Sequence, residues 1–289
     1  MSHVLRNQEI DHSDPRVRSG RVSWWHITSE YADVVDDIVE TLAPEGPYAY
    51  STYVQDPDGT AIPRVKIMTT REGIRQAYLN VHRYVAVREM RAIAEIRNDW
   101  YTFLYGVGYG LDKATGTISP TPTAVIFPTF GQLGITGELY WTRWRQGDVV
   151  LGGGELANQQ AILAIHDRFV GYLRNAAIDD IIALTEPGAQ TAVRDYVNDT
   201  GTLVESHDAT ELSHYLELFY ARFRVHEVEL IHRYVANWFV FAELRWVVEE
   251  VAKPGSVLTF DTAELMEIGP DGKVVARIGH GTGFDHSSQ

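Results

Sequence analysis

The chain contains no cysteine, so it has no disulfide bond, no thiolate nucleophile and no sulfur ligand for a metal. No stretch approaches the ~18 consecutive apolar residues of a membrane-spanning helix. The polar first twenty residues lack the apolar segment of a signal peptide. Basic residues number 25 against 39 acidic ones, and a net charge of −14 repels nucleic acid and anionic membranes. These absences predict a cytoplasmic protein that binds neither nucleic acid nor membranes.

Sequence motifs for common cofactors are also missing. No Walker loop, HExxH metal motif or GxSxG nucleophile elbow occurs, and the GVGYG run at 106–110 lacks the following helix of a dinucleotide site. His226, Glu227, Glu229 and His232 have the side chains of a metal site. On a strand, however, the two acids point away from the two histidines. The sequence therefore predicts neither a cofactor nor a metal.

The chain does contain an internal repeat. Residues 226–246 align without gaps on residues 88–108, which places Glu227 on Glu89, Ile231 on Ile93, Trp238 on Trp100 and Phe241 on Phe103. At 289 residues the chain suits two domains of ~130 residues. We expect an N-terminal arm over 1–24, a first domain over 25–155 and a second domain over 156–289, with a Gly-rich linker around 152–160.

Hydrophobic periodicity predicts similar elements in both copies. The first should have helices at 30–43 (capped by Ser29) and 70–85, the second with Ile74, Ala77, Tyr78 and Val81 on one side. It should also have two short strands within 48–68, and strands at 88–97, 100–110 and 123–145, the last with a break near Pro128 to Gly134. The second should have one helix at 161–177, a second that starts at Asp179 and a third that Asp208 caps. Its strands should lie at 190–197, 226–246 (as a hairpin), 256–268 and 274–281. The predicted fold class is α+β, with two tandem cone-shaped domains. Each is a curved antiparallel sheet wrapped around about three helices and enclosing a pocket.

This element order, ending in the GPDGK turn before VVARIGHG, resembles the SnoaL-like branch of the nuclear transport factor 2-like superfamily. That group includes ketosteroid isomerases, scytalone dehydratase and lindane dehydrochlorinase. The resemblance is clearest over 160–280. It implies a cone-shaped fold, but not one reaction, because such cones carry out many reactions.

Three residues match catalytic positions of those relatives, and a fourth is the nearest candidate for another position. The resemblance implies that His226 is the catalytic histidine, Asp179 its carboxylate partner, and Glu264 the acid on the inner face before the turn. Asp195 is similar in position to the isomerases' general base, with a two-residue gap. The isomerases' oxyanion-hole tyrosine falls on Phe169, which argues against a true ketosteroid isomerase.

Residue chemistry leaves alternatives open at each position. A neutral imidazole can exchange protons near pH 7, but His226 and His232 on an apolar strand face could also be core histidines. Asp179 at the start of a helix is also an ordinary N-cap. Glu264 in an apolar pocket would have a raised pKa, unless it is an edge residue paired with an arginine such as Arg245.

The first copy has Arg88 and Ala94 where the second has His226 and His232, and keeps Glu138 opposite Glu264. We therefore expect an active second domain and a degenerate first one, together forming an intramolecular pseudo-dimer that could assemble into a homo-oligomer. The side chains expected to contact the substrate are Tyr172, Tyr234, Trp238, Phe169 and Arg88.

The leading hypothesis is a cofactor-independent acid–base enzyme, a lyase (dehydratase or related elimination) or isomerase. It would act on a hydrophobic, aromatic or polycyclic small molecule, and changing His226 to alanine or glutamine would lower turnover by ~10²–10⁴. One alternative is an epoxide hydrolase or cyclase using Asp195 and Glu264. Another is a non-catalytic binding or assembly module, which a pocket closed by side chains would favour.

Overall fold

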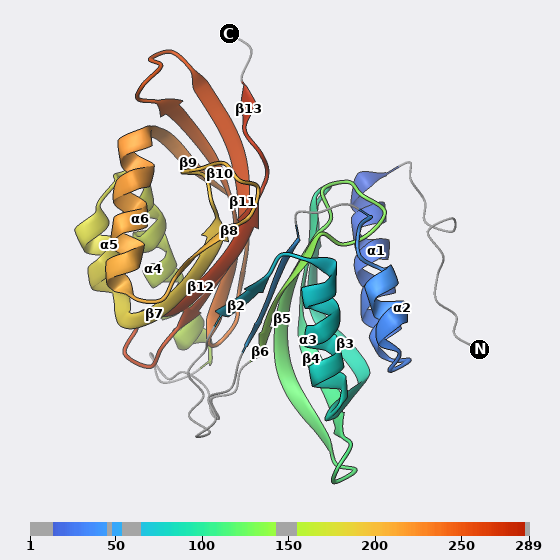
Figure 1. Ribbon diagram of the computed structural model, residues 1–289. Coiled ribbons are helices and arrows are strands. Elements are labelled where there is room, and N and C mark those ends of the chain that lie inside the picture. The colour runs from blue at the N-terminus through green and yellow to red at the C-terminus, as the bar shows by residue number, and fades with distance from the viewer. Residues whose placement is uncertain (1–13, 45–47, 54–64, 143–154, 287–289) are drawn as a thin grey trace. The chain divides into compact units, whose positions relative to one another are not determined.

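The computed structural model describes residues 14–44, 48–53, 65–142 and 155–286 (Figure 1). The chain divides into two compact units, Met1–Arg145 and Gln146–Gln289. Each has one sheet with helices packed on one face, so the fold class is α+β with two tandem domains, as predicted. Within the described residues, no helix is long and apolar enough to cross a membrane.

The first unit has a six-stranded sheet in the order β2-β1-β6-β5-β4-β3. Strands β3 to β6 form an antiparallel meander, while β1 joins β6 in parallel, so the sheet is mixed rather than wholly antiparallel. Its elements are α1 (Pro15–Glu30), α2 (Val35–Glu40), β1 (Ala49–Tyr53), β2 (Val65–Met68), α3 (Arg71–His82), β3 (Val85–Arg97), β4 (Tyr101–Asp112), β5 (Ile118–Pro128) and β6 (Gly137–Thr142).

The second unit repeats this arrangement in the order β8-β7-β12-β11-β10-β9, with a short β13 beside β11. Again one pair, β7 with β12, is parallel. Its elements are α4 (Glu155–Arg174), α5 (Ile178–Leu184), β7 (Thr185–Arg194), β8 (Leu203–Ser206), α6 (Ala209–Arg222), β9 (Phe223–Val235), β10 (Phe239–Glu250), β11 (Val257–Ile268), β12 (Val274–Gly281) and β13 (Asp285–His286).

The internal repeat is present in the structure and includes the positions of the β-bulges. Strands β9 and β10 begin at the positions that align with the first residues of β3 and β4 and have the same lengths, and α6 begins where α3 does. In β3 the pairing skips residues 88 and 93, and in β9 it skips residues 226 and 231, which are the aligned positions of the repeat. Each skipped residue is a β-bulge, which bends a strand and helps a sheet curl around its helices.

Three boundaries differ from the prediction. The expected arm is wrong from residue 15 onward, because Asp14 accepts two backbone N–H groups and Pro15 opens α1, an ordinary helix start. Ser29 lies inside α1 rather than capping a helix. Residues 155–160 of the expected linker belong to α4. The break expected near Pro128 to Gly134 within 123–145 is confirmed, since β5 ends at Pro128 and β6 begins at Gly137 and pairs with it antiparallel; residues 143–145 of that prediction lie outside the described part.

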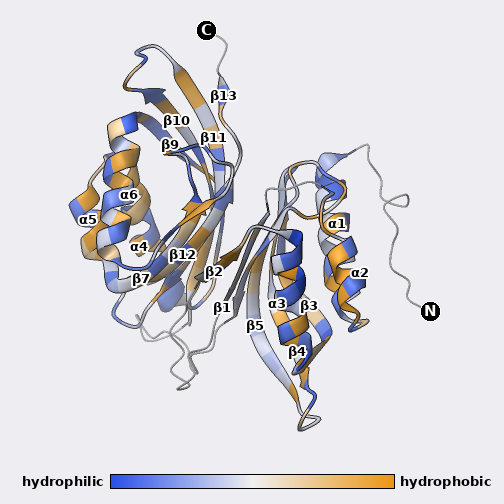
Figure 2. Ribbon diagram, in the orientation of Figure 1, coloured by the Kyte–Doolittle hydropathy of each residue, from blue (hydrophilic) through white to orange (hydrophobic). Residues whose placement is uncertain are grey.

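Each unit buries a separate core between its helices and the inner face of its sheet. In α3 the buried residues are Ile74, Tyr78 and His82, spaced four apart on one side; Val81, expected on that side, is exposed. In α6 they are Leu212, Leu216 and Phe219. Both helices show alternating apolar and polar bands in Figure 2, as expected for helices with one apolar face. The two cores differ in the polar side chains that they bury.

Candidate functional sites

A half-enclosed cavity of about 40 Å³ lies inside the second unit. This volume holds about three water molecules, far less than the ~300 Å³ or more of a typical ligand pocket. Side chains of the second core therefore nearly fill it. The lining residues are Leu173, Val193, Arg194, Tyr196, Tyr215, Leu216, Phe219, Tyr220, Trp246, Phe260, Thr262, Glu264, Arg277, Gly279 and His280.

Glu264, one of the predicted catalytic residues, does line this cavity. Its partner is Arg277 rather than Arg245: Nε donates to Oε2 and Nη2 to Oε1, both at 2.7 Å, and both side chains are buried. Arg245 instead binds Asp261 with two hydrogen bonds of 2.9 and 3.0 Å. A buried carboxylate held by both its oxygens is poorly placed to take a proton from a substrate.

The hydroxyl groups around the cavity are also engaged. Tyr196 donates to the Thr282 carbonyl at 3.0 Å, Tyr215 to the Arg194 carbonyl at 3.1 Å, and Tyr220 to the Leu173 carbonyl at 2.7 Å. Because a hydroxyl has one proton, none of the three has one left for a ligand. The second unit thus presents a small, aromatic cavity in which Glu264 and Arg277 bind each other and the three tyrosine hydroxyls donate to backbone carbonyls.

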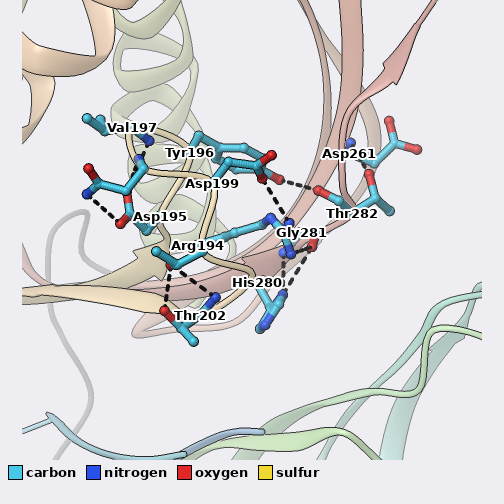
Figure 3. A network of polar contacts seen from close by, with 12 residues as sticks. Arg194, Asp195, Tyr196, Val197, Asp199, Thr202, Asp261, His280, Gly281 and Thr282 are labelled. Atoms are coloured by element: carbon cyan, nitrogen blue, oxygen red, sulfur yellow. Dashed lines mark hydrogen bonds and ion pairs between the residues drawn. The ribbon is translucent and has the colours of Figure 1, made fainter. Parts of the chain in front are cut away.

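The edge of this cavity is a polar network around β7 and β12 (Figure 3). In it, the Gly281 N–H donates to Nδ1 of His280 at 2.8 Å, and Arg194 Nη1 donates to the Gly281 carbonyl at 3.4 Å. Burial, reinforced by the Arg194 charge, lowers the pKa of His280 to about 4. His280 is therefore a neutral, structural imidazole at neutral pH.

This environment should make the second unit sensitive to acid. The folded pKa of about 4 is below the ordinary 6.5, so the unfolded chain binds more protons and stability falls as pH falls from 6.5 to 4. The neutral His280 imidazole contributes on the order of 3 kcal/mol to the free energy of unfolding above this pH range. Urea unfolding at several pH values should show that the free energy of unfolding falls less between pH 6.5 and 4 in His280→Asn than in the wild type. The exposed His214→Asn is the control, and an undiminished loss in His280→Asn would contradict the assignment.

His226 and His232 do not reach the cavity. The bulges at residues 226 and 231 reset the alternation of β9, so the prediction that both histidines share the buried face with Val228 is wrong. His226 is exposed and contacts Glu249, with Nε2 3.0 Å from Oε2. His232 is exposed and contacts Glu243 at 2.6 Å, on the face opposite the helical core.

The two predicted aspartates are also outside the cavity. Asp179 is exposed in the first turn of α5; the N-cap is Ala177 and no side chain caps this helix, so the alternative prediction of an N-cap at Asp179 is also wrong. Asp195 accepts the N–H groups of Val197 and Asn198, both at 3.0 Å, and so holds the turn after β7 (Figure 3). The expected convergence of His226, Asp179 and Glu264 is absent, as is an Asp195–Glu264 pair.

The predicted substrate contacts lie elsewhere as well. None of the five is among the described residues that line the cavity. Phe169 is buried under the Arg277 guanidinium, 5.2 Å from ring centroid to Cζ, and Tyr172 packs at the edge of the core. Trp238 packs edge-to-face against Phe239, Tyr234 pairs with Phe241 across the strands, and Arg88 is exposed at its bulge.

A second buried polar cluster lies inside the first unit. It consists of His26 and Glu30 on α1, Tyr78 on α3 and Glu138 on β6, which we call the His26 cluster. His26, Tyr78 and Glu138 are at most 5% exposed. Four residues from three elements thus place a buried imidazole, a phenol and two carboxylates together inside one core.

Short contacts join these groups. His26 Nε2 is 2.8 Å from the Tyr78 hydroxyl, and that hydroxyl is 2.7 Å from Glu138 Oε2. The same imidazole nitrogen is 3.8 Å from Glu30 and 3.6 Å from Glu138. On the other side of the ring, His26 Nδ1 is 2.5 Å from the Thr41 hydroxyl.

The two carboxyl groups differ in their surroundings. Burial, together with the nearby charge of Glu138, raises the pKa of Glu30 well above its ordinary value, although a Tyr78 hydrogen bond opposes this. Burial and the Glu138 charge also raise the pKa of Tyr78. The site therefore favours a protonated Glu30 beside an acceptor, which is the pairing that acid–base catalysis uses.

This cluster is also where a metal could bind among the described residues. One ligand atom from each of His26, Glu30 and Glu138 lies within 4.8 Å of the others. A cation at His26 Nε2 would have to displace the Tyr78 hydroxyl, which already occupies that nitrogen. The hydrogen bonds favour the metal-free arrangement.

Strand register corrects the predicted match between the two copies. Phe103 pairs with Ile126 and Ile126 with Leu139; the corresponding chain in the second unit runs Phe241, Leu265 and Ile278. Glu138, one residue before Leu139, therefore corresponds to Arg277 and not to Glu264. Glu264 corresponds to Val125, since Val125 pairs with Leu104 and Glu264 with Ala242.

The sequence reasoning missed His26 and Glu30 because they fell at the boundary of the expected arm. A usable signal was present: the two residues are four apart, on the same side of a helix as Val22. Tyr78 was placed correctly on the inner side of its helix. Its role depends on contacts with β6 and α1, which sequence spacing does not reveal.

No protein family profile and no curated protein matches the chain. Solved structures that match include an LEH-like epoxide hydrolase from M. tuberculosis (13% identity, 43% of this chain, 84% of that one, TM-score 0.35). Another is an epoxide hydrolase/cyclase-like enzyme of salinomycin pyran ring formation (14% identity, 44% of this chain, 97% of that one, TM-score 0.36). A third is a hypothetical protein with a ketosteroid isomerase-like fold from Catenulispora acidiphila (16% identity, 43% of this chain, 85% of that one, TM-score 0.33).

Proposed function

We propose that the chain is a cofactor-independent enzyme that moves protons on a hydrophobic small molecule, as an isomerase or a lyase, at the His26 cluster. The observation that carries this proposal is the buried chain from His26 through Tyr78 to Glu138, with Glu30 beside it. Burying such groups in an otherwise apolar core costs stability, so their presence there favours a functional reason.

Each residue has a role that its contacts support. Glu138 accepts a proton from a C–H bond of the substrate, and the electron pair of that bond forms a new double bond. Glu30, kept protonated by burial and by Glu138, supplies a proton to the carbonyl or leaving oxygen. Returning the proton to another carbon completes an isomerisation, whereas loss of the protonated leaving group completes an elimination.

The surroundings support a hydrophobic substrate. The core around the cluster is aromatic: the Tyr50 and Tyr78 ring centroids are 5.5 Å apart, and Phe127 packs 5.6 Å from the His26 ring. Desolvated surroundings also strengthen the electrostatic effect of the catalytic groups on a neutral substrate.

Deuterium uptake from heavy water tests this function. Wild-type protein is incubated with enolisable ketones of increasing size (cyclohexanone, 2-decalone, 2-tetralone), and mass spectrometry follows exchange at the carbon next to the carbonyl. We expect exchange faster than in buffer, and a loss of ~10²–10⁴ in Glu138→Gln, as for removal of a general base.

The exposed Glu217→Gln on α6 is the matched control and should exchange at the wild-type rate. Full activity in Glu138→Gln, or a wild-type rate no faster than buffer for every ketone, would overturn the proposal.

For the second unit we propose a non-catalytic role, in binding a very small molecule or in supporting the fold. The observation that favours it is that Glu264 and Arg277 bind each other and that the three tyrosine hydroxyls around the cavity donate to backbone carbonyls.

A further inference from the structure

The Thr41 hydroxyl determines which nitrogen of His26 carries a proton. Thr41 lies 2.6 Å from the Ile38 carbonyl oxygen, which can only accept, so the single hydroxyl proton points there. The Thr41 oxygen can then only accept from the imidazole at 2.5 Å. Nδ1 of His26 therefore carries a hydrogen, and Nε2 is the nitrogen that faces Tyr78.

The remaining two contacts also require a defined number of protons. Nε2 of His26, the Tyr78 oxygen and Glu138 Oε2 form two consecutive hydrogen bonds of 2.8 and 2.7 Å. Each needs one proton between its two heavy atoms, so three sites share two protons. With only one proton, one of these short contacts would bring two lone pairs together.

Two arrangements satisfy this count. In the first, His26 is protonated at Nε2 and donates to Tyr78, which donates to an ionised Glu138. In the second, a protonated Glu138 donates to Tyr78, which donates to a neutral His26. They hold the same protons and differ only by a shift of each proton along its own hydrogen bond.

We propose that His26, Tyr78 and Glu138 form a proton relay in which the Tyr78 hydroxyl passes a proton between the imidazole and the carboxylate. Thr41 is a positioning residue that fixes the ring through Nδ1. In the first arrangement Glu138 is ionised and can accept a proton from a substrate. When Tyr78 passes its proton to Glu138 and receives the one on Nε2 of His26, the chain shifts to the second arrangement, and the reverse shift makes Glu138 an acceptor again. Use of the relay in catalysis rests on the proposed function, but the relay is a property of the resting protein.

The repeat supplies an internal comparison. Leu216 stands at the position of the second unit that aligns with Tyr78, and Arg277 corresponds to Glu138. Neither can take part in such a chain, because leucine has no proton to pass and arginine stays protonated. The relay is therefore confined to the first unit.

Nuclear magnetic resonance of protein labelled with ¹⁵N in histidine tests the relay without any substrate. The titratable groups that contact His26 are Glu30 on its own helix, Tyr78 on α3 and Glu138 on β6; Tyr50 on β1 and Tyr140 on β6 lie near the two carboxyl groups. Spectra are compared across pH for wild type, Tyr78→Phe and Glu138→Gln.

We expect Nδ1 of His26 to be protonated in the wild type at every pH where the protein is folded. The Nε2 shift should lie between its protonated and unprotonated limits, and should move to one limit in Tyr78→Phe and in Glu138→Gln. The control is Tyr48→Phe, which removes another buried hydroxyl of the first unit, one that donates to the Ala43 carbonyl; it should leave Nε2 unchanged.

An unprotonated Nδ1 in the wild type, or a wild-type Nε2 shift in both variants, would overturn the relay. Circular dichroism identifies a variant that fails to fold. In that case the relay is tested by the protonation of Nδ1 in the wild type and by the Nε2 shift in the other variant. Because these spectra need no turnover, failure of the relay and failure of the deuterium assay are separate outcomes.

Discussion

Replacing Glu264 with leucine is expected to destabilise the second unit by about 3–5 kcal/mol, the usual cost of leaving a buried charge without its partner. Arg277 is buried, and two of its nitrogens donate to the Glu264 carboxylate. Once that carboxylate is removed, the guanidinium remains beside the Phe169 ring in an apolar core. Chemical unfolding in urea measures the loss.

The double variant Glu264→Leu with Arg277→Met provides the control. Removing both charges leaves no uncompensated group, so most of the lost stability should return. The first unit shows that a core of this fold accepts an apolar residue at the Glu264 position, since Val125 stands there, fully packed. A single variant as stable as wild type, or a double variant no better than the single, would contradict a structural role for the pair.

This pair and the His26 cluster show how one fold supports two different interiors. Glu138 in the first unit and Arg277 in the second occupy the same place on equivalent strands. One is joined to a phenol and an imidazole, the other to a carboxylate. Protons can move along the first set of contacts, whereas the second set neutralises two charges.

The sequence was sufficient to predict the repeat, the fold class and most helices. The gap-free alignment of the two copies holds for β3 with β9 and for β4 with β10, because the paired strands begin at aligned positions and have the same lengths, and β3 and β9 skip the same aligned residues. The Asp208 cap was also predicted correctly: its carboxylate accepts the N–H groups of Thr210 and Glu211.

The faces of β9 could not be predicted, because strict alternation holds only in a regular strand. A bulge adds one residue without an opposite partner and moves every later side chain to the other face. Two bulges lie within this strand, so His226 and His232 turn outward while Arg233 turns toward α4 and contacts Asp167.

The His26 cluster was missed for a different reason. Its members come from α1, α3 and β6, and only tertiary packing brings them together. Matching Glu138 to Glu264 by their shared Glu-Leu pair also concealed the difference, because the two glutamates lie on different strands of the repeat.

The most direct test of where the chemistry takes place compares two histidines in the deuterium-exchange assay. His26 is buried in the first unit, and His226, the residue that the sequence favoured, is exposed on a bulge of the second. Both are replaced with glutamine, and exchange into the ketones is measured at one pH. We predict that His26→Gln loses ~10²–10⁴ of the wild-type rate while His226→Gln keeps it. Loss of activity in His226→Gln with full activity in His26→Gln would contradict the assignment.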